Sequence, residues 1–133
     1  MGEPTTIELV MPWPPSVNGY WRSIVQGKTR NGKPLVRQII SAKGRAYRSS
    51  ALAAIDRAGS PYIAGEVTIE ELFYPPCRRR RDLDNYRKAL RDALTTGGVI
   101  DDDSMIRVDH GEWREVDTKN PRVEVRITRK ESA

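Results

Sequence analysis

Two hydrophobic periodicities alternate along this chain of 133 residues, and their order restricts the fold more than any other feature. A repeat of two residues, or a β-branched run, is typical of strands. Spacings of three and four, or a run of helix formers, are typical of helices. Strands are therefore expected over residues 5–11, 35–41, 66–74, 105–116 and 122–130, and helices over residues 42–59 and 83–96. The resulting order, ββαβαββ, predicts an α/β (α+β) fold in which two helices pack on a mixed β-sheet.

Glycine and proline residues mark the boundaries between these segments. The stretch PWPPSVNGYW, residues 12–21, contains three prolines and an Asn-Gly pair, which favour irregular chain with a turn. A second turn is expected at residues 27–34, and glycines are expected to end the helices, at Gly59 and at Gly97–Gly98. The last two strands are joined by the polar segment DTKNP and are expected to form a terminal hairpin. The length fits one domain, residues 1–133.

Composition limits the chemistry and the partners of the chain. The 23 lysines and arginines exceed the 18 aspartates and glutamates, so the net charge is +5 and nucleic acid is the first partner to consider. A single cysteine, Cys77, excludes an intrachain disulfide and a Cys-rich zinc site, and it fits a reducing cytosol. No long apolar run indicates a membrane span. With one histidine, His110, and no Walker-type glycine loop, any catalysis is expected to rest on carboxylates, lysine and arginine.

The stretch RRRRDLDNYRK places two carboxylates inside a basic block, where Asp82 and Asp84 follow four arginines. The helix expected here carries a polar stripe away from its apolar face, formed by Asp84, Lys88, Arg91 and Thr95. A surface ion pair between Asp84 and Lys88, or capping of the helix by Asp82 and Asp84, would explain the carboxylates. If residues 82–84 are extended, the two carboxylates point the same way. Capping does not explain the four arginines, because the helix dipole disfavours positive charge at its N-terminus.

A second acidic cluster, Asp101–Asp103, follows about twenty residues later. By itself such a run is usually a solvated polar turn. The apolar residues around it indicate that the chain is entering a strand, where three adjacent like charges repel one another. A divalent cation relieves this repulsion, and Mg2+ is commonly held by one or two carboxylates with a substrate phosphate. The two clusters together favour a metal-dependent nuclease in which arginines hold a phosphodiester, the metal activates water, and a lysine orients that water or neutralises charge.

These charged segments resemble the RusA family of Holliday junction resolvases, small endodeoxyribonucleases of bacteria and phages. The resemblance lies in RRRRDLDNYRKALRDAL, in GGVIDDDSMI and in the proline-rich MPWPPSVNGYWR, and it extends over about residues 7–128. It implies Mg2+-dependent cleavage of four-way DNA junctions by paired symmetric nicks in recombination and repair, with Mn2+ as a substitute. It also implies a cytoplasmic protein of a bacterium or its phage, with no membrane partner and no nucleotide cofactor. The resemblance also implies a homodimer, because a four-way junction is two-fold symmetric and two opposed nicks need two sites.

The same resemblance implies roles for individual residues. Asp82, Asp84, Asp103 and Lys88 are expected to be catalytic. Asp82, Asp84 and Asp103 are expected to bind the metal, with Asp102 in support, and Asp103 is the most plausible member of the triplet. The residues expected to bind DNA are Arg78, Arg79, Arg80, Arg81, Arg87, Arg91 and Asn18.

Two other functions fit the same residues. One is a non-catalytic basic module that binds branched or duplex DNA, with carboxylates that act only as caps and ion-pair partners. The other is a less selective structure-specific nuclease of phage origin. In the second turn, Lys28, Arg30 and Lys33 either follow a DNA backbone or belong to a solvated loop.

Overall fold

A computed structural model describes residues 5–130 and contains the strands and the two longer helices that the sequence predicts. In chain order the elements are β1 (Thr6–Pro12), α1 (Val17–Tyr20), β2 (Trp21–Lys28), β3 (Pro34–Ile40), α2 (Ala42–Arg57), β4 (Val67–Tyr74), α3 (Asp84–Thr96), a short 3-10 helix η1 (Asp103–Met105), β5 (Ile106–Trp113) and β6 (Arg122–Arg129).

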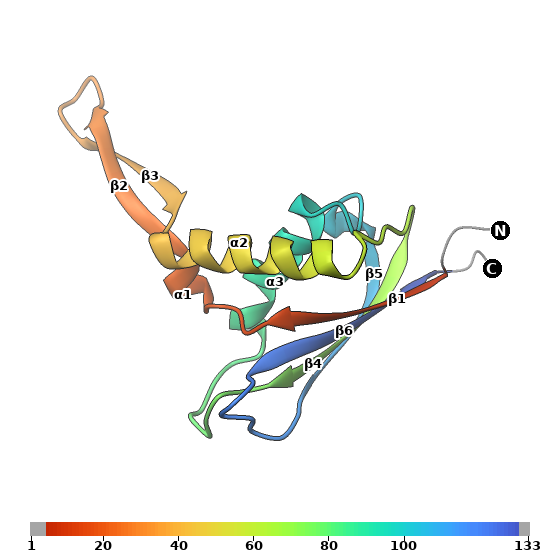
Figure 1. Ribbon diagram of the computed structural model, residues 1–133. Helices are drawn as coiled ribbons and strands as arrows, with labels where there is room; N and C mark the ends of the chain where they lie inside the picture. The colour runs from red at the N-terminus through yellow and green to blue at the C-terminus, as the bar shows by residue number, and fades with distance from the viewer. Residues whose placement is uncertain (1–4, 131–133) are drawn as a thin grey trace.

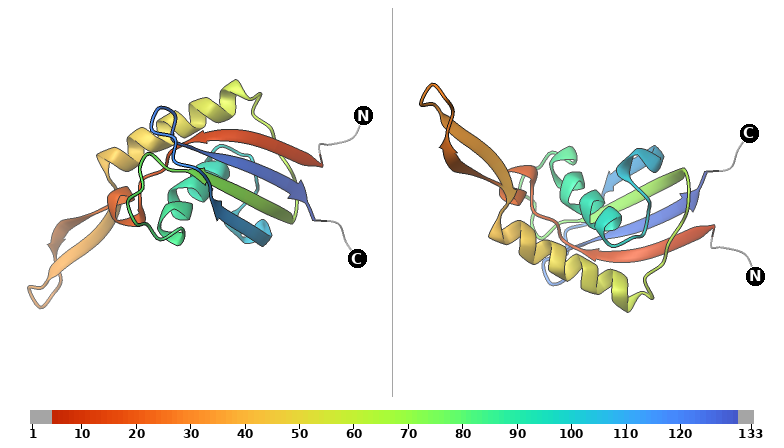
Figure 2. Two further views of the ribbon diagram at one scale, coloured as in Figure 1. Left: turned by 90° about the horizontal axis from the view of Figure 1, so that it is seen from below. Right: turned by 90° about the horizontal axis from the view of Figure 1, so that it is seen from above.

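Four strands form one mixed sheet in the order β1-β6-β4-β5 (Figures 1 and 2). Strand β6 pairs antiparallel with β1 and with β4, whereas β5 runs parallel to β4. The predicted terminal hairpin is therefore wrong, because β4 lies between β5 and β6. The reason lies in the connections: α3 links β4 to β5 and supplies the crossover that a parallel pair requires.

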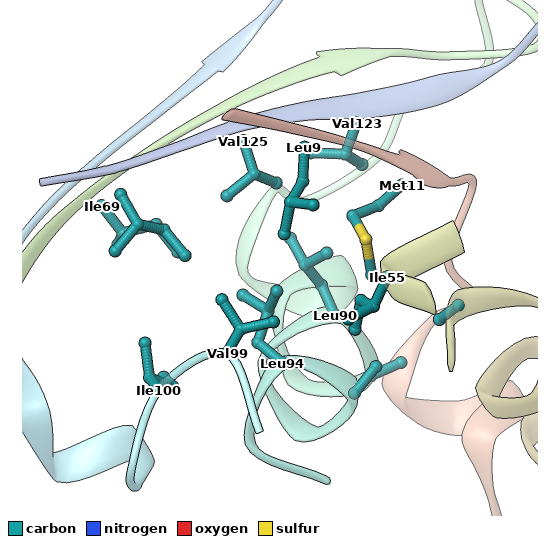
Figure 3. Close-up of a cluster of buried hydrophobic side chains, with 14 of the residues drawn as sticks. Leu9, Met11, Ile55, Ile69, Leu90, Leu94, Val99, Ile100, Val123 and Val125 are labelled. Atoms are coloured by element: carbon teal, nitrogen blue, oxygen red, sulfur yellow. The ribbon is translucent and has the colours of Figure 1, made fainter. Parts of the chain in front are cut away.

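The two longer helices, α2 and α3, pack on one face of this sheet, as the sequence predicts (Figure 1). The predicted apolar face of α3 is buried, including Leu90 and Leu94, which are 0% exposed. In Figure 3 these two leucines lie beneath Leu9 of β1 and Val125 of β6, close to Ile55 of α2. Each fully buried side chain of this size stabilises the fold by about 1.5–3 kcal/mol, so this layer fixes where α3 lies on the sheet.

A second sheet consists only of β2 and β3, which pair antiparallel and project from the body as an arm (Figure 1). Strand β3 and the turn before it are confirmed, but the sequence did not reveal β2. Its residues do not alternate between apolar and polar types, because most of the strand is exposed on both faces.

The root of the arm contains a second unpredicted element, the helix α1 of four residues. The stretch 12–21 is therefore not irregular throughout: Ser16 caps a helical turn by accepting a hydrogen bond from the Gly19 N–H at 3.3 Å. Tyr20, the last residue of α1, is fully buried, and its hydroxyl donates a hydrogen bond to Asp92 of α3. Arg48 of α2 pairs with the same carboxylate, so three helices meet at the base of the arm.

The pKa values of Tyr20 and Asp92, the two acidic groups at the base of the arm, are shifted in opposite directions. Burial and the hydrogen bond to Asp92 raise the pKa of Tyr20 to about 12. Burial opposes the charge of Asp92, but hydrogen bonds from Tyr20 and Arg48 outweigh it and lower the pKa of that carboxyl. Asp92 therefore stays ionised and Tyr20 stays protonated at neutral pH, which keeps the hydrogen bond that fastens α1 to α3.

Among residues 5–130, no helix is long and apolar enough to cross a membrane.

The first turn of α2 fits against the root of the arm only because residue 44 is glycine, which yields a test. A Cβ on Gly44 would lie 2.6 Å from the backbone oxygen of Tyr20 and 2.8 Å from Cγ2 of Ile40. Gly44→Ala should therefore lower the free energy of unfolding by about 1–3 kcal/mol, as overpacking does. Helix propensity alone would favour alanine by about 1 kcal/mol, so the expected sign is opposite to the propensity.

Urea denaturation followed by circular dichroism measures this change, with Gly19→Ala as the control. A Cβ on Gly19 would meet no atom closer than 3.7 Å. Equal unfolding midpoints for the two variants would show that the close packing at Gly44 does not hold the arm's root.

Candidate active site

The first predicted carboxylates lie where α3 begins. Asp82 precedes the helix, and its Oδ1 accepts a hydrogen bond from the Asp84 backbone N–H at 3.2 Å. Leu83 has helical dihedral angles, φ −56° and ψ −42°, so residues 82–84 are not extended. Asp82 thus satisfies one of the N–H groups that every helix start leaves without a partner. The Asp84 side chain is 80% exposed, and its Oδ1 lies 3.2 Å from Nη1 of Arg87.

The arginine segment leads directly to these carboxylates. Arg78, Arg79 and Arg80 are exposed, whereas Arg81 is half-buried. The Arg81 guanidinium donates to the backbone oxygens of Cys77 and Arg79 at 2.9 and 3.1 Å, and it lies 5.7 Å from the centre of the Trp13 ring. Arg81 therefore shapes the segment, and the three exposed arginines present positive charge beside Asp82.

Each aspartate of the second cluster has a different partner. Asp101 accepts hydrogen bonds from the Tyr62 hydroxyl at 2.6 Å and the Gly65 N–H at 3.3 Å. Asp102 caps η1 through the N–H and hydroxyl of Ser104, and these hydrogen bonds lower the pKa of its carboxyl. Asp103 accepts a hydrogen bond from the Thr95 hydroxyl of α3 at 2.7 Å. Of the three, Asp103 is the carboxylate that reaches the polar stripe of α3.

The two acidic clusters meet α3 at opposite ends. Asp84 begins the helix and Thr95, the partner of Asp103, lies near its end. This stretch of helix corresponds to about three turns, or roughly 16 Å. Within residues 5–130, no group of three or more His, Cys, Asp or Glu side chains is close enough to hold a metal ion. One chain therefore does not bring Asp84 and Asp103 together.

A buried carboxylate, Glu71 of β4, fixes α3 on the sheet. Glu71 is 0% exposed, and its Oε1 lies 2.9 Å from Nη2 of Arg91 and 3.2 Å from Nε of Arg87. Nε of Arg87 makes no well-aligned hydrogen bond, so that contact is mainly electrostatic. Asp109 of β5 lies 3.1 Å from Arg91 and 3.7 Å from Arg87. Burial disfavours the charge of Arg91, but hydrogen bonds to Glu71 and Asp109 outweigh it and raise its pKa.

A glycine makes room for this ion-pair network. Gly111 of β5 is the direct neighbour of Glu71 in the parallel ladder. A Cβ on Gly111 would lie 2.1 Å from Nη2 of Arg87 and 2.5 Å from Cδ2 of Leu83. Because residue 111 of β5 is glycine, the Arg87 guanidinium can lie over the sheet beside Glu71. Because Arg87 also contacts Asp84, the network extends from the core to the exposed carboxylate.

Sequence reasoning missed the role of Glu71, although the sequence carries a signal for it. The alternation of β4 places Glu71 in the same inward-facing set as Val67 and Ile69. A carboxylate at such a position requires buried cationic partners. The predicted outward direction of the polar stripe is wrong for Arg91, which is turned toward the sheet.

The other predicted residues differ in exposure. Arg87 and Arg91, predicted to bind DNA, have side chains only 18% exposed. Lys88 is exposed on α3, one turn after Asp84. Asn18 is exposed in α1 and lines a hollow of about 600 Å3 at the root of the arm. The catalytic and DNA-binding roles of all these residues stay predictions.

Comparison with known proteins matches this chain to one family over most of its length. A family model described as endodeoxyribonuclease RusA matches residues 12–128. The crossover junction endodeoxyribonuclease RusA of Shigella sonnei (strain Ss046) is 40% identical over 124 residues, which cover 92% of this chain and 94% of the relative. The proteins of the same name from Escherichia coli (strain K12) and Enterobacteria phage 82 are each 39% identical with the same coverage.

Neutralising the buried carboxylate should strongly destabilise the fold. Glu71→Gln keeps the shape of the side chain but removes the charge that Arg87 and Arg91 share. We expect the free energy of unfolding to fall by about 3–5 kcal/mol, the usual cost of breaking a buried ion pair. Glu70→Gln, one residue away on the opposite face of β4, should change it by less than about 0.5 kcal/mol. Urea denaturation measures the free energy of unfolding of both variants, and similar values for the two would contradict the structural role of Glu71.

Proposed function

The chain belongs to the RusA family of endodeoxyribonucleases, and from this membership we propose that it is a crossover junction endodeoxyribonuclease that resolves four-way DNA junctions. The observation that carries the proposal is the start of α3, where the exposed carboxylate of Asp84 and that of Asp82 follow directly on exposed arginines. Carboxylates alone repel a phosphodiester, whereas this arrangement attracts it first. The nuclease chemistry of the family implies a divalent metal ion.

The donor set at the start of α3 fits Mg2+. Hard cations prefer oxygen ligands, and Mg2+ is often bound through one or two carboxylates together with substrate phosphates and water. Asp82 and Asp84 supply two such carboxylates beside cations that bind phosphate. When bound, the metal polarises the phosphate and makes water a better nucleophile. Asp82 and Asp84 hold it, and Asp103 completes the ligand set with support from Asp102.

The basic residues around these carboxylates act on the DNA itself. Arg78, Arg79 and Arg80 neutralise phosphates on either side of the cleaved bond. Lys88, one turn beyond Asp84 on the same helix stripe, orients water or neutralises charge that develops on the phosphate. Arg87 and Arg91 contribute mainly through Glu71, which holds them against the sheet and leaves them a smaller exposed surface for DNA.

A homodimer explains why the two acidic clusters lie apart in one chain. A four-way junction is two-fold symmetric, and a C2 dimer presents two equivalent sites to it. We place the Asp82–Asp84 pair of one protomer beside Asp103 of its partner. Each dimer then contains two complete sites, and each site cuts one of two opposed strands. Residues 1–133 act as one domain in this assembly, in the cytoplasm of a bacterium or of a cell infected by its phage.

Cleavage should depend on metal and on Asp84. The wild-type protein with Mg2+ should place symmetric nicks in a synthetic four-way junction, and EDTA should abolish them. Asp84→Asn should reduce the cleavage rate by at least about a hundredfold, because it removes a metal ligand. Its affinity for the junction should stay within about threefold, because the arginines are unchanged. Denaturing gels measure cleavage, and gel-shift titration in EDTA measures binding.

Asp101→Asn is the matched control, because the Asp101 carboxylate is engaged by Tyr62 and Gly65 and is not among the proposed ligands. It should cleave at close to the wild-type rate. A folded wild-type protein that binds junctions but cuts none with Mg2+ or Mn2+ is the non-catalytic module. Equal cleavage of four-way, three-way and linear substrates identifies the less selective nuclease.

Mixing two inactive variants tests whether sites are shared between protomers. Asp84→Asn and Asp103→Asn should each be inactive alone. In a mixed dimer, the Asp84 of one chain and the Asp103 of the other form one intact site, so the mixture should nick one strand per junction. Sites contained within one chain would leave the mixture as inactive as its components. A nicked-product assay on a supercoiled cruciform plasmid separates single from paired nicks.

A further inference from the structure

The β2–β3 arm carries the whole excess of positive charge of the protein. Five cations lie in residues 21–41: Arg22, Lys28, Arg30, Lys33 and Arg37. The same segment contains no aspartate or glutamate. Because the chain has 23 lysines and arginines and 18 acids, the 18 cations outside the arm balance the 18 acids. The net charge of +5 is therefore located in the arm, of which only Trp21 and Ile40, at its root, pack against the main core.

The arm projects from the body with its tip exposed. Every residue from Val25 to Gln38 is exposed, including the paired Val25 and Val36 at 64% and 60%. Figures 1 and 2 show the hairpin directed away from the four-stranded sheet in all three views. A two-stranded sheet without a packed face is only marginally stable in water. Its charge and exposure are those expected of a surface that becomes ordered against a partner.

In contrast to the tip, the root of the arm is fixed to the helix that carries Asp84. Strand β2 begins directly after the buried Tyr20, whose hydroxyl binds Asp92 of α3. Strand β3 ends at Ile40, and the next residue, Ser41, caps α2 through the Gly44 N–H and donates to the Gly19 carbonyl at 2.6 Å. Both strands therefore leave from packed positions, which orients the arm with respect to α3.

The two faces of the arm differ in chemistry. Cross-strand pairs Ser23–Gln38 and Val25–Val36 lie on one face, and Arg22–Ile39 and Ile24–Arg37 lie on the other. The first face contributes to the hollow of about 600 Å3, which is lined by Val17, Asn18, Trp21, Ser23 and Gln38. Uncharged hydrogen-bonding groups thus lie on one face, with cations on the other face and at the tip.

We propose that the β2–β3 arm binds a duplex arm of the DNA junction away from the cleaved bond, with Lys28, Arg30 and Lys33 of the tip on its phosphates. A two-stranded ribbon fits the major groove of B-DNA. An eight-residue strand reaches about 25 Å, or roughly seven base pairs along the duplex. A second copy of the chain is a poorer occupant, because two arms with five cations and no acids repel each other. The inference rests on the proposed function for its substrate.

The salt dependence of binding tests the proposal. Each phosphate that a protein neutralises adds about 0.9 to the slope of log K against log salt. We expect the tip variant Lys28→Gln/Arg30→Gln/Lys33→Gln to lower the slope by about 2–3, and to weaken junction binding at least tenfold at 100 mM salt. The control variant Arg57→Gln/Lys119→Gln/Lys130→Gln removes three exposed cations of the body and should lower the slope by less than about 1. Binding is titrated in EDTA with a four-way junction and with a 30-base-pair duplex.

Cleavage kinetics separate the arm from the catalytic machinery. The tip variant should raise KM at least tenfold and leave kcat within about twofold, because its missing contacts hold substrate without touching the reacting phosphate. Equal salt slopes for the tip and control variants would overturn the proposal. The proposal would also be overturned if the Val25→Ser/Val36→Ser variant changed the sedimentation mass of the protein and left the salt slope of DNA binding unchanged. That result would identify the arm as a contact between copies of the chain. Failure of the proposed function is a separate result, namely wild-type protein that binds DNA but cuts no junction.

Discussion

The ion pairs between Glu71 and the two arginines of α3 connect the core of the protein to its candidate active site. A charge without a partner is too costly in the centre of a sheet, so burial of Glu71 requires Arg87 and Arg91 to lie over β4. This requirement fixes the rotation of α3 about its axis as firmly as the leucines fix its distance from the sheet. Asp84 begins the same helix and touches Arg87. The buried carboxylate of Glu71 therefore helps to position the exposed carboxylate of Asp84, through Arg87.

Three groups of charges in this protein have different physical tasks. The first lies between sheet and helix, where the buried Glu71 and the more exposed Asp109 neutralise two arginines and stabilise that layer. The second is the exposed arginine segment beside Asp82, where opposite charges remain in solvent and can exchange partners with phosphate. The third is the arm, which is purely cationic. Of these, only the second and third groups are free of buried partners, so a polyanion interacts most favourably with these two surfaces.

Local periodicity predicted the longer elements well, and it failed where structure depends on distant partners. The helix at residues 83–96 was predicted correctly because its buried side chains recur every three or four residues. The prediction that β5 and β6 form a hairpin was wrong, because the alternation of apolar and polar residues in a strand does not show which strand pairs with it. Strand β2 has few buried positions and left no pattern. For the site, the sequence located the acidic segments, but it could not show that Asp84 and Asp103 meet opposite ends of α3.

In the proposed dimer, the separation of those clusters would link the architecture of one chain to the symmetry of a junction. Had all carboxylates converged within a protomer, a monomer could hold the metal and nick any strand that reached it. In the proposed dimer, division of the ligands between two protomers would tie metal binding to dimerisation, and therefore to the presence of a second site related by two-fold symmetry. The root of the arm is fixed to α3 through Tyr20 and Asp92, so the two arms of such a dimer would share that symmetry. Two arms on opposed duplexes would then hold the branch point between the sites, and selection of a four-way substrate would follow from geometry without recognition of any base.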